Sequence, residues 1–274
     1  MTTDSFGRFT IPIMLGAEDA LGADDLAVLL CDTRDDPQRE ARYVEMLAAR
    51  AVDGIIVTGR RTEPRPPLPG DPGCPVVYAF TPSARAEDCS VIADEVGGTE
   101  LAVAHLLAAG RRRLAVITGP RSHRSARVRA AAAERAARAA GAPLLSAPRY
   151  GRWEEATGWE AVAQLLREVP ELDGLVCGSD MIARGALDGL REHRRSVPDE
   201  VAVVGFDNWE VMAAASRPPL TTVDMRLGEL GRIAAGLLRE AIDGRPAPGC
   251  RALPCRLVAR GSTPHIARRR SSSR

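Results

Sequence analysis

The sequence contains no lysine: all 37 of its basic residues are arginine, and asparagine occurs only at position 208. An arginine cluster such as residues 111–113 or 268–270 would ordinarily indicate a phosphate or nucleic-acid site. Here arginine is the only strongly basic residue type in use, so we interpret these clusters as solvated surface. The formal net charge of +1 also gives no overall field that would attract nucleic acid or an anionic membrane.

The motifs of the common enzymes are missing as well. The sequence has no GxSxG elbow, no GxxxxGK[ST] phosphate loop, no HExxH zinc motif and no GxGxxG after a strand. Its four histidines, at positions 105, 123, 193 and 265, are scattered. His105 falls on a helix face, where we expect a packed, hydrogen-bonded side chain and not a base. These absences predict a protein that is not an enzyme and needs no cofactor or metal.

Neither the cysteines nor the apolar runs point to secretion or to a membrane. The six cysteines form no CxxC pair, and several lie in apolar, strand-like runs. We interpret them as reduced, buried thiols. No signal peptide is recognisable, and no apolar run is long enough to cross a bilayer. The sequence therefore predicts a cytoplasmic protein without a membrane partner.

Helical faces alternate with short apolar runs along almost the whole chain. Strands are expected at residues 26–31, 54–58, 75–80, 114–117, near 144, and at 174–177, 201–206 and 221–224. Helices are expected at residues 11–21, from 37 onward, and at 102–109, 126–140, 153–166, 181–190 and 227–241. The apolar face predicted for the first helix consists of Ile11, Met14, Leu15 and Leu21. Such alternation predicts an α/β fold with doubly wound parallel sheets, and the length of the chain indicates two of them.

Polar residues follow the carboxyl ends of several predicted strands. Asp32, Ser179 and Asp207 are three of them. In open parallel sheets, ligands bind beyond the carboxyl ends of the strands. Such side chains match the donors and acceptors of a polyhydroxylated ligand, so we consider all three to be candidate ligand contacts.

Helix capping is the alternative interpretation of these polar residues. Asp207 and Asn208 precede a short helix that is expected to start near residue 209. Ser125 precedes a predicted helix in the same way, and so do Ser179 and Asp180. The sequence pattern alone leaves both interpretations open, and about half of the strand-end residues are expected to be caps only.

A recognisable series of motifs runs along the chain. In order, they are LLCDTRDDPQRE, ARAVDGIIVT, ADEVGGTELAVAHLLAAGRRRLAVITGP, SARVR, GRW, GSDMIARGAL, VPDEVAVVGFDN, RPPLTTVDM and RLVARGST. With these motifs the chain resembles, from about Ile11 to Pro264, the effector-binding domain of LacI/GalR (lactose-repressor-type) transcriptional regulators. That domain has a fold similar to that of the type I periplasmic sugar-binding proteins.

The resemblance implies two doubly wound parallel-sheet lobes with a ligand cleft between them, within a domain over residues 1–264. The lobes would comprise about residues 9–109 plus 226–253 and about residues 110–225 plus 254–264. A small effector, a sugar or related polyol and less readily a purine, would bind between the lobes and favour their closed arrangement. The basic tail, residues 265–274, has too few apolar residues to fold and is expected to be disordered.

Carried over residue by residue, the family's ligand contacts fall on Arg129 of SARVR, Trp153 of GRW, Ser179 of GSD and Asp207 of GFD. A guanidinium and a carboxylate can grip adjacent hydroxyls, while an indole covers the apolar face of a sugar ring. Met225 stands where some relatives present a polar side chain, so a more apolar pocket floor is expected. Without the resemblance, Trp153 would be interpreted as a core aromatic in the first turn of its helix.

Two features depart from the family pattern. Ala132 and Ala133 stand where a glycine and an aromatic residue usually follow SARVR. In addition, the helix-turn-helix, the hinge helix and the first strand of the first lobe have no counterpart before Ile11. We hypothesise that Met1 lies downstream of the native start. Without that strand, the sheet of the first lobe would expose backbone and apolar surface, and poor stability is expected.

The function implied by the resemblance is that of a ligand-sensing transcriptional repressor. It would act as a cytoplasmic homodimer and control operator DNA allosterically, through a helix-turn-helix that this sequence does not contain. The first alternative is a stand-alone or transport-type sugar-binding protein. An enzyme on a similar scaffold, such as a sugar kinase or an epimerase, is disfavoured because a phosphate loop and a catalytic cluster are missing.

Overall fold

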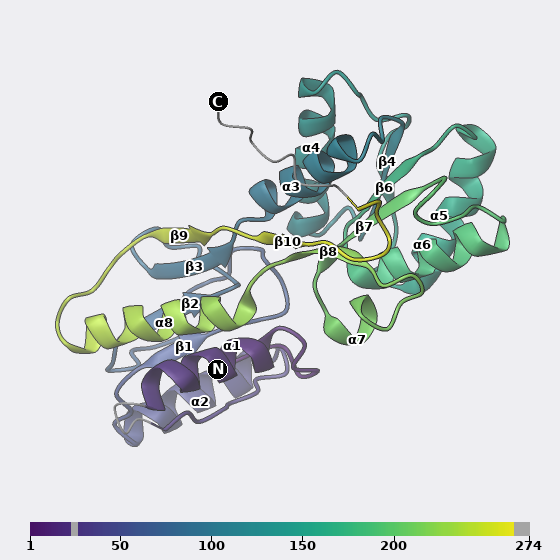
Figure 1. Cartoon of the computed structure of the whole chain (residues 1–274). Coiled ribbons are helices and arrows are strands. Elements are labelled where there is room, and N and C mark those ends of the chain that lie inside the picture. Colours follow the sequence, from purple (N-terminus) through teal and green to yellow (C-terminus); the bar gives the residue numbers. More distant parts are fainter. Residues whose placement is uncertain (23–26, 266–274) are drawn as a thin grey trace, which may run out of the picture. The chain divides into compact units, whose positions relative to one another are not determined.

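The computed structural model of the chain describes residues 1–22 and 27–265 (Figure 1). The chain divides into two compact units. Unit 1 comprises Met1–Asp94 and Arg226–Pro254, and unit 2 comprises Glu95–Met225 and the residues from Cys255 onward. Each unit contains its own sheet with helices packed against it. The predicted α/β class with two parallel sheets is therefore confirmed.

Unit 1 contains a four-stranded parallel sheet with the strand order β1-β2-β3-β9. Its strands are β1 (Ile55–Val57), β2 (Val76–Ala79), β3 (Cys89–Ala93) and β9 (Cys250–Leu253). Its helices are α1 (Thr10–Leu21), α2 (Pro37–Ala49) and α8 (Leu227–Ile242). The sequence analysis assigned no strand to β9, which lies at one edge of this sheet.

Neighbouring residues of β1 pack against different helices. Ile55 belongs to a buried cluster with Leu47 of α2. Ile56 packs against a second cluster, which contains Leu21 of α1 and Ala235 of α8. Because successive side chains of a strand point to opposite faces of its sheet, α2 covers one face, and α1 and α8 cover the other.

Helices α1 and α8 approach each other closely through glycines. A Cβ atom at Gly16 would lie 1.9 Å from the carbonyl oxygen of Gly228, and one at Gly231 would lie 2.0 Å from the carbonyl oxygen of Ile13. Only residues without a side chain allow two helix backbones to pack at such distances. At these two points the helices therefore meet main chain to main chain.

This contact also corrects the predicted apolar face of α1. The helix itself is confirmed, but Ile11 and Leu15 are exposed, whereas Ile13 and Ala17 are buried. The prediction followed the largest apolar side chains. Instead, the small residues around Gly16 turn toward α8, because they allow the closer approach.

The strand predicted at residues 26–31 is not observed. Residues 27–31 form no strand, and residue 26 lies outside the described residues. The nearest pairing is an isolated bridge between Thr2 and Asp32. Leu29 in this segment is 62% exposed although its sequence is typical of a buried strand. The prediction was wrong because a strand requires a neighbour along its length, and this segment has one only at its end.

Unit 2 contains a six-stranded sheet with the strand order β10-β8-β7-β6-β4-β5. Its strands are β4 (Leu114–Thr118), β5 (Arg149–Tyr150), β6 (Gly174–Cys177), β7 (Ala202–Asp207), β8 (Thr221–Asp224) and β10 (Arg256–Val258). All neighbouring strands are parallel except β10, which runs antiparallel to β8. The strand expected near residue 144 forms instead at β5, and no strand was predicted at β10.

The helices of unit 2 are α3 (Glu95–Ala108), α4 (Arg124–Ala139), α5 (Glu155–Glu168), α6 (Asp180–Glu192) and α7 (Glu210–Ala213). The sequence analysis placed the residues of α3 in the first lobe. In the structure α3 packs against α4, β8 and β10, and it belongs to unit 2. The other predicted lobe limits stay a prediction.

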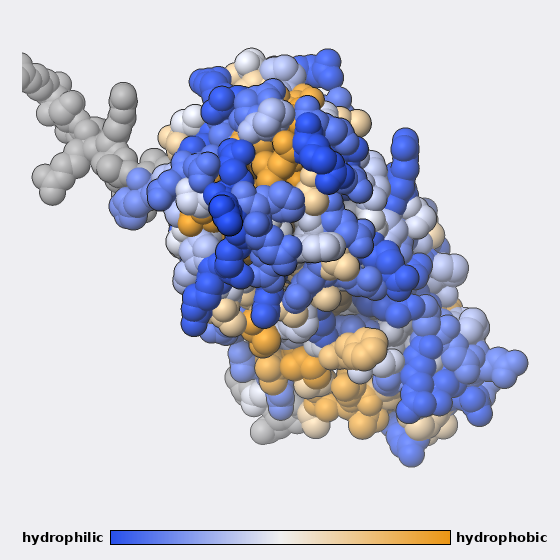
Figure 2. All heavy atoms as spheres, turned by 90° about the vertical axis from the view of Figure 1, so that its right-hand side faces the viewer, coloured by the Kyte–Doolittle hydropathy of each residue, from blue (hydrophilic) through white to orange (hydrophobic). Residues whose placement is uncertain are grey.

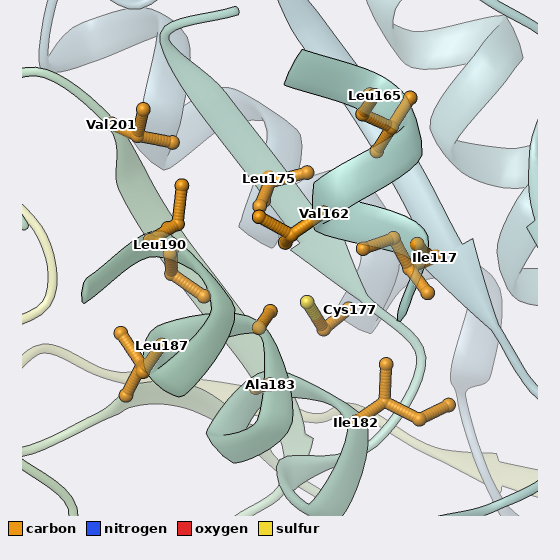
Figure 3. Packing of buried hydrophobic residues seen from close by; sticks show 14 of the residues in the cluster. Ile117, Val162, Leu165, Leu175, Cys177, Ile182, Ala183, Leu187, Leu190 and Val201 are labelled. Atoms are coloured by element: carbon orange, nitrogen blue, oxygen red, sulfur yellow. The ribbon is translucent and has the colours of Figure 1, made fainter. Parts of the chain in front are cut away.

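A large apolar core joins α5 and α6 to the sheet of unit 2. Figure 3 shows Leu165 of α5, Leu175 and Cys177 of β6, and Ile182 and Leu190 of α6 pointing toward one another. All five side chains are fully buried. This close packing fixes the strands of the unit 2 sheet, and with them the residues at the strand ends.

The cysteines are only partly as predicted. Cys31, Cys177 and Cys255 are buried, as predicted. Burial raises the pKa of the Cys177 thiol strongly. Cys250 is exposed, because it lies on the edge strand β9, so the prediction of burial was wrong for this residue. The predicted disorder of the tail concerns residues 266–274, which lie outside the described residues.

Within the described residues, no helix is both long enough and apolar enough to span a membrane.

His105 is a packed, hydrogen-bonded side chain, as expected. Its Nε2 lies 2.8 Å from Oγ1 of Thr263, which connects α3 to the segment after β10. Burial lowers the pKa of His105 below its ordinary value of 6.5.

The glycine contact between α1 and α8 yields a first prediction. Gly231→Ala should lower the free energy of unfolding by about 1–3 kcal/mol, because the added methyl group collides with main chain of α1. The matched control is Gly236→Ala in the same helix, where a Cβ meets nothing within 4 Å. This control should raise the stability by about 0.5–1 kcal/mol through its better helix propensity. Urea unfolding of both variants checks the prediction, and equal effects would contradict it.

The half-buried side chain of His105 yields a pH prediction. Since the pKa of His105 is lower in the folded state, the unfolded chain binds the proton first as the pH falls. The contribution of this group to stability is therefore complete above pH 6.5 and is lost as the pH falls through the folded-state pKa. His105→Gln does not titrate and can still bond to Thr263, so its stability should fall less between about pH 7 and pH 5. Identical pH profiles of the two proteins, measured by urea unfolding, would contradict this.

Candidate functional site

Four neighbouring strands of unit 2 end at the same edge of its sheet. β8, β7, β6 and β4 are adjacent and parallel, so their carboxyl ends lie side by side. Asp207 is the last residue of β7. Met225, Gly178 and Gly119 directly follow β8, β6 and β4. This edge is where open parallel sheets bind their ligands, and it brings residues from four distant parts of the chain together.

The guanidinium of Arg129 lies at the centre of this edge. It comes from α4, and its Nη1 donates to the carbonyl oxygen of Gly178 at 2.6 Å and to Oδ1 of Asp207 at 3.3 Å. Its Nε donates to Oε1 of Glu95 at 2.9 Å. The guanidinium carbon lies 3.7 Å from the centroid of the Phe206 ring, within the range of a cation–π contact. Arg129 is therefore fixed from three sides.

Glu95 is a residue of this cluster that the sequence analysis did not single out. It is the first residue of α3, and it also pairs with Nη1 of Arg124 at 3.1 Å. Burial alone would lower the pKa of Arg129, but the carboxylates of Glu95 and Asp207 outweigh burial and raise it. Its position in the sequence could have identified Glu95 as a candidate site residue, because it follows an apolar run just as Asp207 does.

The burial of these charges is not explained by stability alone. Arg129, Glu95 and Asp207 are 6%, 3% and 9% exposed. Removing such ions from water is costly, and replacing a buried ion cluster by apolar residues often stabilises a protein by about 1–4 kcal/mol. A role in recognition gives a physical reason for retaining the cluster.

The backbone at Asp207 and Asn208 is strained. Their φ angles are +110° and +52°, a region that costs a residue with a side chain about 1–3 kcal/mol. Asn208 is held by two hydrogen bonds: its N–H donates to Oγ1 of Thr222, and its Oδ1 accepts from Arg260. The capping alternative is wrong for Asp207 and Asn208, because Trp209 occupies the N-cap position of α7.

Ser179, in contrast, is a helix cap. Its Oγ accepts a hydrogen bond from the N–H of Ile182 at the start of α6, and the residue is buried. Asp180 is the first residue of α6 and accepts from Oγ1 of Thr222 at 2.5 Å. Ser125 lies inside α4, after its N-cap His123, so the cap expected there was wrong. Contact between Ser179 and a ligand stays a prediction.

Trp153 lies just before α5 and not in its first turn. The indole Nε1 donates to Nδ1 of His123 at 2.8 Å, and the guanidinium carbon of Arg129 is 6.0 Å from the ring. The ring lies over Gly119, where a Cβ would come within 2.2 Å of the indole. Part of the side chain packs on the apolar core of unit 2, so the core interpretation is partly right. His123 and Gly119 are supporting residues that the sequence analysis missed.

The other two predicted contacts differ in their location. Met225 is fully buried, and its sulfur lies 3.8 Å from Nη2 of Arg129. Asp32 belongs to unit 1, where it is half-buried and accepts hydrogen bonds from Ser5 Oγ and the N–H of Arg34. The structure thus brings Arg129, Trp153, Asp207 and Met225 together in unit 2. A contact between Asp32 and the same ligand stays a prediction.

The arrangement has the chemistry of a binding site for hydroxyl groups. It combines a guanidinium, a carboxylate and an aromatic ring, which recognise hydroxyls and the apolar face of a sugar ring. Thr118 ends β4, and its buried hydroxyl has no hydrogen-bond partner within residues 1–22 and 27–265. Among the described residues of the whole chain, no group of three or more His, Cys, Asp or Glu residues could hold a metal ion.

Comparisons with known proteins agree on one family. Residues 103–263 match the family described as periplasmic binding protein-like domain. The HTH-type transcriptional regulator CelR of Thermobifida fusca is 33% identical over 243 residues, which cover 86% of this chain and 70% of that protein. A structure described as a transcriptional regulator CelR–cellobiose complex has a TM-score of 0.76 at 30% identity and covers 93% of this chain and 79% of that chain.

A LacI-family regulator from Rhizobium etli has a TM-score of 0.87 at 23% identity, with 96% of both chains covered; at this identity the match shows the fold alone. The matched domain and the CelR relative go further, because each covers more than half of the chain. The chain belongs to the LacI/GalR family of transcriptional regulators and carries the periplasmic binding protein-like domain of that family.

Proposed function

We propose that this chain is the sensing part of a transcriptional regulator and that a sugar or related polyol binds at the strand ends of unit 2. The observation that carries the proposal is the buried cluster of Arg129, Glu95 and Asp207 beside Trp153. Such a cluster offers charged hydrogen-bonding groups and an aromatic ring at one place, which matches the two kinds of surface of a sugar.

The role of each side chain follows from its contacts. Glu95 and the carbonyl of Gly178 hold the guanidinium of Arg129, so that it is oriented before a ligand arrives. Asp207 is the acceptor for ligand hydroxyls, and Trp153 provides the ring surface. Met225, which is fully buried with its sulfur 3.8 Å from Arg129, would form the apolar floor of the site. Ser179 and Asp32 are the remaining contacts of the proposal.

A sugar is the ligand class best supported by the relatives. The structure described as CelR–cellobiose complex is that of a regulator bound to a disaccharide. The groups at the strand ends of unit 2 are those that a saccharide requires. A purine is less well matched, because the cluster offers one half-buried indole and two charged carboxylates.

The regulatory output belongs to the same proposal. The relative CelR is named as a helix-turn-helix regulator. We infer that this chain acts as a homodimer that controls operator DNA through such a motif, in the cytoplasm and without catalysing a reaction. The six cysteines of the sequence form no CxxC pair, which favours a reducing compartment, where disulfides are rare.

A ligand screen with a matched pair of variants tests this function. We expect one or more sugars in a panel of mono- and disaccharides, polyols and purine bases to raise the melting temperature and to be recovered unconverted. Calorimetry on that ligand should then show a loss of about 10- to 100-fold in affinity for Asp207→Asn, which removes a charged acceptor.

The control for this variant is Asp173→Asn. Asp173 is also a buried aspartate of unit 2 paired with an arginine, Arg113, but it precedes β6 and so lies at the amino edge of the sheet. The Asp173→Asn variant should be less stable than the unchanged protein but should bind the ligand with the same affinity. Equal affinity of Asp207→Asn and the unchanged protein would remove Asp207 from the site, and conversion of the ligand would indicate an enzyme.

Tryptophan fluorescence tests the place of the ligand. A sugar stacked on the indole of Trp153 changes the surroundings of that ring, so its emission should change on binding. Trp153→Phe should lose most of this change and bind more weakly. Trp159→Phe should keep both, because Trp159 is exposed on α5 and bonds to Glu192. A signal that persists in Trp153→Phe and disappears in Trp159→Phe would contradict the assignment.

A further inference from the structure

The indole of Trp153 is held at two points beside the site of unit 2. Its six-membered ring lies against Gly119, where a Cβ would come within 2.2 Å of Cε2 and 2.3 Å of Cδ2. Its Nε1 donates a hydrogen bond of 2.8 Å to Nδ1 of His123. The contact with Gly119 sets how closely the ring approaches the sheet edge, and the bond to His123 sets the direction of its N–H. The hydrogen bond therefore determines how the ring is turned.

His123 is itself fixed through its backbone. It is the N-cap residue of α4, the helix that also carries Arg129. Its N–H donates to the carbonyl oxygen of Pro120 at 2.8 Å, and its carbonyl oxygen accepts from the N–H of Arg127 at 3.3 Å. The imidazole and indole rings are tilted by 38°, with centroids 6.2 Å apart, so they meet through the hydrogen bond and are not stacked. One helix thus positions both the guanidinium and the indole.

The hydrogen bond requires a neutral imidazole. An indole N–H can only donate, so Nδ1 of His123 must accept with its lone pair and the ring must carry its proton on Nε2. In the protonated imidazolium both ring nitrogens carry a hydrogen. Two N–H groups would then face each other across 2.8 Å. A second proton on His123 and the observed position of the indole therefore exclude each other.

The charged groups on the elements around this bond do not ordinarily titrate near neutral pH. The basic ones come from the loop before α4, from α4 and from the segment before α5, and they are Arg121, Arg124, Arg127, Arg129 and Arg152. The carboxylates paired with these arginines are Glu95, Asp207 and Glu154. Arginine keeps its charge throughout, and carboxylates ordinarily titrate below about pH 5. His123 is half-buried, so protons from the solvent reach it.

The rest of the chain also changes its charge little in this range. Figure 2 shows that hydrophilic side chains cover much of the surface on the face that it displays. Because the sequence contains no lysine, the strongly basic side chains are all arginines, and only four histidines are present. Histidine is the side chain that ordinarily changes its charge between about pH 5 and 8. A pH effect on the surroundings of Trp153 can therefore be assigned by replacing single histidines.

We propose that His123 is the residue that positions Trp153 for the ligand and that it makes ligand binding depend on pH. The proposal rests on the proposed function, in which a sugar ring lies on the indole of Trp153. The neutral imidazole holds the indole in place, and the imidazolium that forms on acidification releases it. The ligand then binds the neutral form more tightly, so by linkage its binding in weakly acidic solution expels a proton.

Tryptophan emission tests the hydrogen bond without any ligand. In a protein with Trp159→Phe and Trp209→Phe, the emission of Trp153 should change between about pH 7.5 and 5.5, because its neighbour becomes charged. His123→Gln offers an oxygen as acceptor but does not titrate, so this change should disappear. The matched control is His193→Gln, at the exposed C-cap of α6, which should keep the change. An equal change in His123→Gln would overturn the proposal.

Calorimetry tests the coupling to the ligand, with the panel sugar that raises the melting temperature most as the probe. An imidazole that titrates near pH 6.5 loses about nine-tenths of its neutral form between pH 7.5 and 5.5. The affinity of the unchanged protein should therefore fall about tenfold over this range. His123→Gln should bind about as tightly at pH 7.5 and should lose less than about twofold at pH 5.5. His123→Leu, which offers no acceptor, should bind weakly at both pH values.

Proton release gives a further measure of the coupling. At about pH 6 the binding enthalpy of the unchanged protein should depend on the ionisation enthalpy of the buffer, and that of His123→Gln should not. Equal pH dependence of affinity in these two proteins would overturn the proposal while leaving the proposed function intact. If no sugar of the panel bound at any pH, the proposed function would fail, and the pH dependence of binding with it. The emission titration would still decide whether His123 holds Trp153.

Discussion

The buried guanidinium of Arg129 is the constraint on which the site of unit 2 depends. A single charged group holds the start of α3 through Glu95, the end of β6 through Gly178 and the end of β7 through Asp207. None of these groups can move without leaving a buried charge short of a partner, a loss that costs several kcal/mol, roughly 3–5. The cluster therefore couples the orientation of the recognition groups to the integrity of the sheet edge, and the strained backbone at Asp207 is held by the same contacts.

The parallel sheet explains why such a cluster can be built from distant residues. Arg129 is separated by 34, 49 and 78 residues from its partners Glu95, Gly178 and Asp207. Parallel strands place their carboxyl ends at one edge, so β6 and β7 bring Gly178 and Asp207 together there, while the helices α3 and α4 supply Glu95 and Arg129. The core of α5 and α6 beneath that edge keeps the strands from shifting, which is what a preorganised binding site requires.

The long sequence separation of these partners explains which parts of the site could be predicted from the sequence. Strands such as β6 and β7 are local apolar runs, and their end residues, Asp207 above all, could be located from the pattern alone. The carbonyl of Gly178 and the support from Glu95 could not, because they depend on how separate segments meet in space. The face of α1 was misjudged for a related reason: Gly16 determines it through its contact with α8, which no feature of α1 itself reveals.

The wrong prediction at residues 26–31 is of a different kind. Strands β6 and β7 have similarly apolar sequences, and each is paired on both sides and buried. Residues 27–31 have the same composition and meet a neighbour only at Thr2. The sequence of this segment thus encodes burial that its surroundings do not provide. Apolar residues are stabilised by burial wherever they lie in a fold. The exposure of residues 27–30 therefore reflects how few neighbours pack against them in unit 1, and not a weak strand signal in their sequence.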